Sequence, residues 1–298
     1  MKTIVNMHLH ELTLGTEVFN KIAAIAPTWV EEHPTAKHAR AMYIDHDETV
    51  KEVKEILQFL LGKGYHTNII GWSHESNNRN IRILRTRRFG DLEIKASTLL
   101  LPWTASRIHC FTRNQGQILC LAETESQSQA DLRHARDFAN AGTSLVCSSR
   151  ARRGLEAGNL KGLNFRPTAL MPRSQKRQLA GEVEEWSKYG EPWWQVWSDV
   201  ALPWTAPSCI KRDPQTYTAL PRETVNKFVF RDEGYSDHLW RYLRSELVPL
   251  GAFDIARTPE FYPFPWVIVS QRFHRVVHEN GFECDFRPVF IDEDVNGG

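Results

Sequence analysis

The sequence lacks several features that would assign it to a function class at once. None of its five cysteines forms a C-x-x-C pair, neither sign of charge is in excess, and no apolar run approaches the roughly 18 residues of a membrane span. The 37 basic and 36 acidic side chains nearly cancel, which argues against an electrostatic commitment of the whole protein to nucleic acid. The N-terminus also lacks the basic-then-apolar pattern of a secretion signal. We therefore expect a cytoplasmic protein that makes no contact with a membrane.

The odd number of cysteines predicts free thiols rather than a disulfide framework. In a reducing compartment an isolated cysteine behaves as a small apolar side chain, and no local motif supplies the base that a catalytic thiol needs. We expect neither a thiol-based active site nor a cofactor. The cysteines are Cys110, Cys120, Cys147, Cys209 and Cys284.

The pattern of apolar residues predicts an α+β protein with more than one part. A chain of 298 residues is long enough for two domains or one elaborated domain. At 50–61 the apolar residues recur at three- and four-residue steps, which indicates an amphipathic helix. We expect a small N-terminal α+β domain at 1–97, a first repeat half at 98–175 and a second repeat half at 176–298.

The segment at 254–290 predicts the architecture of both repeat halves, because much of it occurs twice. It has the pattern of a buried strand, a helix that begins at a serine, a glycine stop and a second strand. The same features recur at 144–167, so we interpret the pair as an internally duplicated strand–helix–strand unit. Serine is a favoured N-cap residue, which predicts a structural role for it in both copies. The shared residues are Ser148 and Ser270, Arg150 and Arg272, and the Phe-Arg-Pro tripeptides at 165–167 and 286–288.

The second copy resembles a known bacterial family, the double-CXXCG motif family. The resemblance covers 251–273 and the Phe-Arg-Pro-Val at 286–289, and more weakly the first copy at 145–167. Members are associated with immunity to polymorphic toxins, so the resemblance implies a protein that binds a cognate toxin. Where the family carries its C-x-x-C-G knuckles, this chain has the pentapeptide Leu-Pro-Trp-Thr-Ala at 101–105 and 202–206. The thiolate pairs of a zinc ribbon are missing, so zinc is not expected.

Two groups of side chains are candidate binding surfaces. Five guanidinium groups within ten residues suit an acidic protein partner or phosphates, although such charges are also typical of a solvated edge strand. Clustered tryptophans mark an interaction surface or fill a core between packed elements. The candidate residues are Arg82, Arg85, Arg87 and Arg88, in the arginine cluster that begins at Arg79, and Trp193, Trp194 and Trp197.

His8 and His10 are candidate metal ligands. Side chains alternate along a strand, so this spacing places both imidazoles on one face. Two imidazoles make a weak motif, because a closed site needs three or four ligands. Solvated or hydrogen-bonded histidines are the alternative interpretation.

The second half also carries an insertion that we expect to be helical. Ser236 is a candidate N-cap, and apolar residues recur with helical spacing from Leu239 to Leu247. Asp237 and His238 adjoin this serine, but neighbouring residues rarely converge on one reacting atom. We therefore predict no catalytic set in the insertion.

The first hypothesis is a non-enzymatic immunity protein that neutralises a bacterial toxin by direct occlusion. The alternatives are a metal-dependent hydrolase that uses His8 and His10, and a nucleic-acid-binding protein that uses the arginine cluster at 79–88. Comparison of the two copies aligns His274 with Arg152 and His278 with Glu156, so the histidines are not part of the shared pattern. We expect function to lie where the copies differ.

Overall fold

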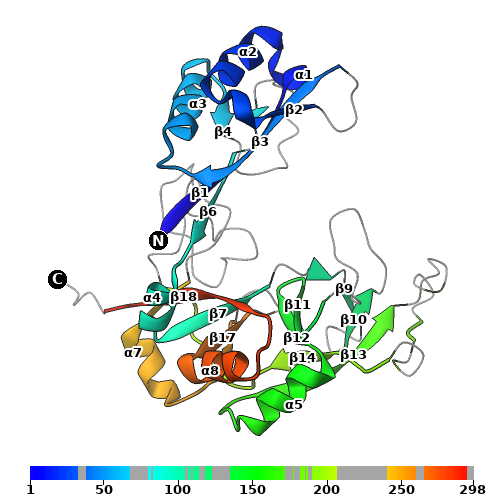
Figure 1. Cartoon of the computed structure of the whole chain (residues 1–298). Coiled ribbons are helices and arrows are strands. Elements are labelled where there is room, and N and C mark those ends of the chain that lie inside the picture. The colour runs from blue at the N-terminus through cyan, green and yellow to red at the C-terminus, as the bar shows by residue number, and fades with distance from the viewer. Residues whose placement is uncertain are drawn as a thin grey trace, which may run out of the picture. The chain divides into compact units, whose positions relative to one another are not determined.

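The structure is a computed structural model, and it combines helices with several sheets in an α+β architecture, as predicted. The chain divides into two compact units: unit 1 holds Met1–Gly90, and unit 2 holds Asp91–Phe230 with Leu239–Gly298 (Figure 1). Unit 1 ends before the predicted boundary at 97, because the helix that follows Gly90 packs on a strand of unit 2. The described residues are 1–298 without 33–37, 68–79, 82, 105–106, 109, 114–117, 123–134, 172–176, 178–181, 185, 187–189, 207–239, 260–264 and 294–298.

Within the described part of unit 1, four antiparallel strands form a sheet that carries helices α2 and α3. The strand order is β2-β3-β1-β6. Val5, Met7 and Leu9 of β1 lie in one buried core with apolar residues of both helices. The helix predicted at 50–61 is α3, which confirms that prediction. The elements are β1 (Lys2–His10), α1 (Glu11–Leu14), α2 (Thr16–Ile25), the 3-10 helix η1 (Pro27–Trp29), β2 (Val30–Glu32), β3 (Arg40–Asp47), α3 (Lys51–Gly62), β4 (His66–Thr67), β5 (Asn80–Ile81) and β6 (Ile83–Arg88).

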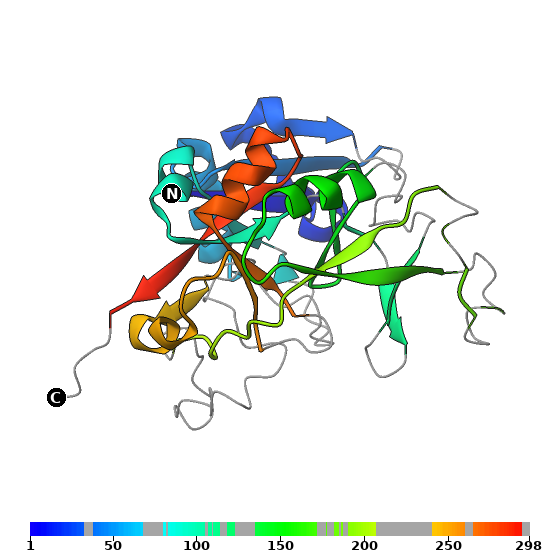
Figure 2. The same ribbon diagram turned by 90° about the horizontal axis from the view of Figure 1, so that it is seen from below.

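Within the described part of unit 2, a seven-stranded and a five-stranded sheet are joined by helices α5 and α8, which lie side by side (Figure 2). The strand–helix–strand unit predicted at 254–290 is β17, α8 and β18, which confirms the prediction. The elements are α4 (Asp91–Ala96), β7 (Leu99–Trp103), β8 (Arg107–Ile108), β9 (Cys110–Arg113), β10 (Ile118–Ala122), β11 (Phe138–Ala141), β12 (Ser144–Cys147), α5 (Ser149–Ala157), β13 (Asn164–Met171), β14 (Trp194–Trp197), β15 (Arg241–Leu243), α7 (Arg244–Leu247), the 3-10 helix η6 (Val248–Leu250), β16 (Ile255–Arg257), β17 (Val267–Ser270), α8 (Gln271–Glu279) and β18 (Asp285–Asp292).

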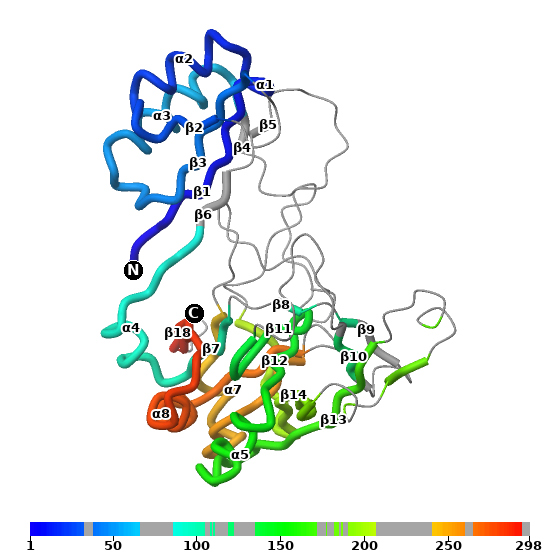
Figure 3. The backbone as a smooth tube through the Cα atoms, turned by 45° about the vertical axis from the view of Figure 1, so that its right-hand side comes forward, coloured from blue at the N-terminus to red at the C-terminus, as the bar shows by residue number. Residues whose placement is uncertain are grey.

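Each sheet of unit 2 has a central strand that comes from the other predicted half of the chain. The strand orders of the two sheets are β8-β11-β12-β14-β13-β10-β9 and β15-β18-β7-β17-β16. β7 precedes the first copy along the chain, yet it lies between β17 and β18 of the second copy (Figure 1). Its position beside β18 is also visible in Figure 3. β14 lies in the same way between β12 and β13 of the first copy. The predicted halves at 98–175 and 176–298 are therefore interlocked within one compact unit.

Each exchanged strand ends in a tryptophan that stacks on the arginine of a Phe-Arg-Pro tripeptide. The guanidinium carbon of Arg287 lies 4.1 Å from the centroid of the Trp103 ring, and that of Arg166 lies 3.4 Å from the Trp197 ring. Such stacking contributes about 0.5–2 kcal/mol, depending on how far the cation is desolvated. The shared tripeptide therefore has a packing role in both sheets.

The two Leu-Pro-Trp-Thr-Ala pentapeptides do not occupy equivalent positions, contrary to the prediction. The first contributes the end of β7, which pairs with the Phe-Arg-Pro strand β18. The strand that pairs in the same way with the Phe-Arg-Pro strand β13 is β14, so β14 is the counterpart of β7. The second, at 202–206, lies outside the named strands. Two segments are structurally equivalent when they pair with equivalent strands of their sheets. Five identical residues do not determine which strands a segment pairs with.

The predicted helical insertion is also corrected. Ser236 lies outside the described residues, and the chain resumes with the strand β15, followed by the single turn α7. Trp240 and Tyr242 are buried in the core of the five-stranded sheet. This alternation is typical of a strand, and it was mistaken for helical spacing because Trp240 and Leu243 also fit a three-residue step.

Candidate functional site

The three tryptophans predicted for a binding surface belong to the scaffold. Trp193 and Trp197 are only 7% and 6% exposed. Trp194 is half-buried, and its ring lies 3.8 Å from the guanidinium carbon of Arg152. Trp193 directly precedes β14, and Gln195, Val196 and Trp197 of β14 are buried. The prediction of a contact surface was therefore wrong for Trp193 and Trp197, and the alternative of tryptophans in a core holds for them.

The described arginines of the cluster do not share one basic face. Arg87 is 5% exposed, whereas its neighbour Arg88 is exposed and forms an ion pair with Asp45 at 3.4 Å. Adjacent strand residues point to opposite faces, so the prediction of a binding surface is wrong for Arg87. Arg79 and Arg82 lie outside the described residues, as does the side chain of Arg85.

His8 and His10 share a face of the unit 1 sheet, as predicted, and Tyr43 lies with them. The Tyr43 ring makes edge-on contacts with both imidazoles, at centroid distances of 5.1 Å to His8 and 5.8 Å to His10. Among the residues that the structure describes, no group of three or more His, Cys, Asp or Glu side chains is placed to hold a metal ion. In the same part of the chain, no helix has the length and apolar character needed to cross a membrane.

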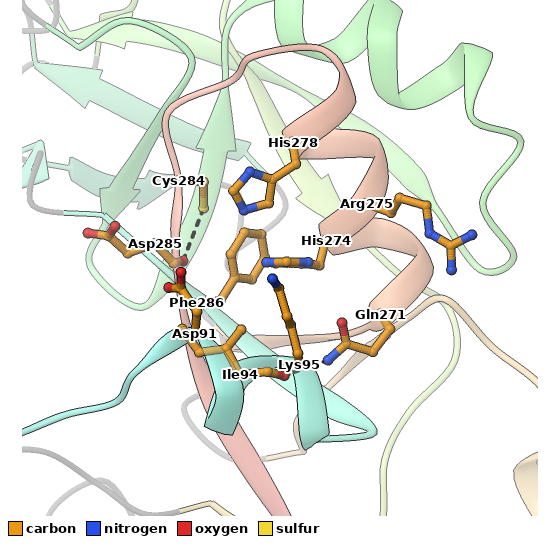
Figure 4. Close-up of a pocket in the computed structure, with 10 residues that line it drawn as sticks. All are labelled: Asp91, Ile94, Lys95, Gln271, His274, Arg275, His278, Cys284, Asp285 and Phe286. Atoms are coloured by element: carbon orange, nitrogen blue, oxygen red, sulfur yellow. Dashed lines mark hydrogen bonds between the residues drawn. The ribbon is translucent and has the colours of Figure 1, made fainter. Parts of the chain in front are cut away.

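A groove of about 510 Å³ lies between α4 and α8 in unit 2, and it brings together the histidines that differ between the copies (Figure 4). Helix α8 supplies one wall, α4 a second, and the start of β18 the floor. The lining residues are Asp91, Ile94, Lys95, Gln271, His274, Arg275, His278, Cys284, Asp285 and Phe286.

Helix α4 is fixed against α8 by hydrogen bonds from one side chain. The Gln271 amide nitrogen donates to the carbonyl oxygens of Ile94 and Ser97, both at 2.6 Å. The Ser97 hydroxyl in turn donates to the Leu99 carbonyl at 2.7 Å, at the start of β7. The Ser270 hydroxyl caps α8 by accepting from the Arg272 amide at 3.1 Å, which confirms the predicted N-cap. Gln271 therefore attaches the C-terminal end of α4 to the start of α8.

Lys95, His274 and His278 point toward one another in the groove, whereas Arg275 points away from it (Figure 4). The two imidazole centroids are 4.5 Å apart, and the His274 ring meets the buried Phe286 ring edge-on at 4.7 Å. Burial lowers the pKa of His274, and the nearby His278 and Lys95 lower it further, against the opposing effect of Asp91. His274 is therefore kept neutral at pH 7.

Cys284 lines the same groove as a protonated thiol. Burial raises its pKa above the usual range, and the adjacent Asp285 carboxylate adds to the effect. Only the thiolate is a strong nucleophile. The groove is therefore equipped to bind a ligand rather than to attack one through sulfur.

The first copy has a smaller groove at the corresponding position, and two side chains that line it are paired with each other. This groove, of about 300 Å³, runs along α5. Arg152 and Glu156, four and eight residues after the N-cap Ser148, form an ion pair at 2.8 Å. His274 and His278 have the same offsets from Ser270. The positions that form an ion pair in the groove of the first copy are thus occupied by two imidazoles in the second.

The residues that the copies share make matching contacts inside the scaffold. Arg150 binds the buried Asp137 carboxylate through two hydrogen bonds of 3.0 Å, and Arg272 binds Asp254 at 3.1 Å. Each aspartate immediately precedes the first strand of its hairpin, Asp137 before β11 and Asp254 before β16. The shared arginines are therefore structural, and the side chains that differ line the two grooves.

Comparison of the chain with protein-family models, with curated proteins and with solved structures gives no match. The resemblance to the double-CXXCG family therefore stays a prediction. Sequence analysis had isolated His274 and His278 as residues that differ between the copies, but it missed Lys95 and Asp91. No local pattern reveals that their short helix packs against a helix far along the chain.

Proposed function

We propose that the chain is a non-enzymatic binding protein of the toxin-immunity type, which occludes a protein toxin and contacts it through the α4–α8 groove. The observation that supports this function is the contrast between the copies. Shared residues hold the scaffold together, whereas the second groove is the larger and carries two histidines where its counterpart carries the Arg152–Glu156 ion pair.

The composition of the groove suits a protein partner. Its centre is apolar, with Phe286 buried and Ile94 half-buried, and its rim is charged, with Asp91, Lys95 and Asp285 exposed. An apolar centre inside a polar rim is the usual anatomy of a protein–protein contact. The fixed position of α4 adds preorganisation, which reduces the entropic cost of binding.

Coexpression with the product of the neighbouring gene tests the proposal. The chain, carrying an affinity tag, is expected to retain that product through purification and to restore growth of cells that the product otherwise inhibits. A product that neither inhibits growth nor co-purifies with the chain would contradict the proposal.

A further inference from the structure

The charges that line the groove have an order, and this order restricts what can bind. Figure 4 shows Asp91 and Asp285 on one side of the Phe286 ring and Lys95 with His274 on the other. The side that Lys95 and the two imidazoles share therefore offers several N–H donors and, once a histidine is protonated, more than one positive charge.

We propose that this side of the groove accepts a carboxylate from an aspartate or glutamate of the bound partner, held between Lys95, His274 and His278. The inference rests on the proposed function, because the carboxylate belongs to the protein that the groove contacts. Histidine and lysine form charge-assisted hydrogen bonds to carboxylates that are about twice as strong as neutral ones. The Phe286 ring beside them excludes water from one face of the site.

A cation is the less suitable occupant of this position. Two imidazoles four residues apart on one helix have a spacing that metal ions accept. Lys95, however, places an ammonium group beside them, and that charge already lowers the pKa of His274. The same positive charge repels a metal ion and attracts an anion.

Carboxylate binding is coupled to protonation of His274. The groups that face this imidazole are His278 on its own helix, Lys95 and Asp91 on α4, and Asp285 at the start of β18. In the empty groove the pKa of His274 lies below the ordinary value of 6.5. A bound anion favours the charged form and raises this pKa, so binding takes up a proton. The affinity therefore rises as the pH falls through the pKa of the bound form and levels off below the lowered pKa of the free form.

Titration of the whole chain with acetate tests the site without the partner, by NMR of the histidine side chains. A carboxylate within hydrogen-bond distance is expected to raise the pKa of His274 by about 1 unit. Lys95→Gln is expected to weaken acetate binding about tenfold. Lys161→Gln is the matched control, because it makes the same change at an exposed position of unit 2 that does not line the groove, and it should bind acetate as the unmodified chain does.

Three further arms decide the outcome. Acetamide, which is uncharged, should leave the pKa of His274 unchanged, and so should sodium chloride at the ionic strength of the acetate solution. A shift with either compound as large as the shift with acetate would overturn the site. If inorganic phosphate binds more than about tenfold tighter than acetate, the site is one for free phosphate, and the inference of a partner carboxylate is overturned. No shift with acetate would overturn this inference alone, because copurification tests the proposed function separately.

Discussion

At the scale of single residues, Asp137 and Asp254 have the same task in the two copies. Each carboxylate accepts from an arginine of its own copy and also from a backbone amide of the other, that of Glu283 for Asp137 at 3.1 Å and that of Lys161 for Asp254 at 2.9 Å. The aspartates therefore join the two copies as well as holding their own helices.

Removal of one of these carboxylates should cost more than removal of a surface charge. Asp137→Ala removes a buried carboxylate and leaves the partly buried Glu283 amide without this acceptor, and it is expected to lower the free energy of unfolding by about 2–3 kcal/mol. The control is Arg153→Ala on α5, the helix that carries Arg150; its ion pair with Glu191 is exposed on both sides and is worth less than about 1 kcal/mol. Urea denaturation measures both, and equal losses would contradict the role of Asp137.

Some of these residues were identified from sequence, and others depend on distant contacts. Ser148 and Ser270 were predicted as N-caps because the cap contact is local. The burial of Trp193 and Arg87 depends on which strands flank them and on which face is covered. Composition left both a contact surface and a core open for Trp193, and the structure places it in a core. For Arg87 composition indicated an exposed side chain, which the structure corrects.

At the scale of elements, α5 and the loop that follows α8 pack so closely that a glycine is needed. A Cβ atom at Gly154 would lie 2.5 Å from Cζ of Phe282. Alanine is normally the better helix former, so this position reverses the usual preference. The contact explains how the two copies fit together along their helices.

Gly154→Ala is therefore expected to destabilise the protein. Overpacking costs about 1–3 kcal/mol, against up to about 1 kcal/mol gained in helix propensity. Phe282→Leu in the same chain should recover part of the loss. Gly62→Ala in α3 is the control: open space surrounds that position, and the substitution should stabilise unit 1 by up to about 1 kcal/mol. Thermal unfolding that shows a gain at both glycines would contradict the packing argument.

At the scale of the whole molecule, the exchange of β7 and β14 makes unit 2 inseparable. A fragment that ends at 175 lacks β14, and a fragment that begins at 176 lacks β7. Each sheet would lose a central strand and expose two rows of backbone donors and acceptors.

Fragments 91–175 and 176–298 should consequently fail to unfold cooperatively when alone. Refolded together, they should co-elute from a sizing column and regain a single cooperative transition by circular dichroism. Cooperative unfolding of either fragment by itself would show that the exchanged strand is dispensable.

The α+β class and the unit formed by β17, α8 and β18 could be predicted because they depend on local periodicity. The strand exchange could not be predicted. An apolar strand such as Leu99–Trp103 could pair within either sheet, and its neighbours are set by contacts with strands far along the chain. The groove depends on the same long-range arrangement. The matched contacts agree with an internal duplication, whose origin stays a prediction.

The most direct measurement is the affinity of the neighbouring-gene product for three forms of the whole chain, by isothermal titration calorimetry. We expect Lys95→Gln to weaken binding by about tenfold or more, and Lys161→Gln, which changes an exposed lysine outside the groove, to stay within about twofold of the unmodified chain. Equal affinities for all three forms would show that the groove between α4 and α8 is not the contact site.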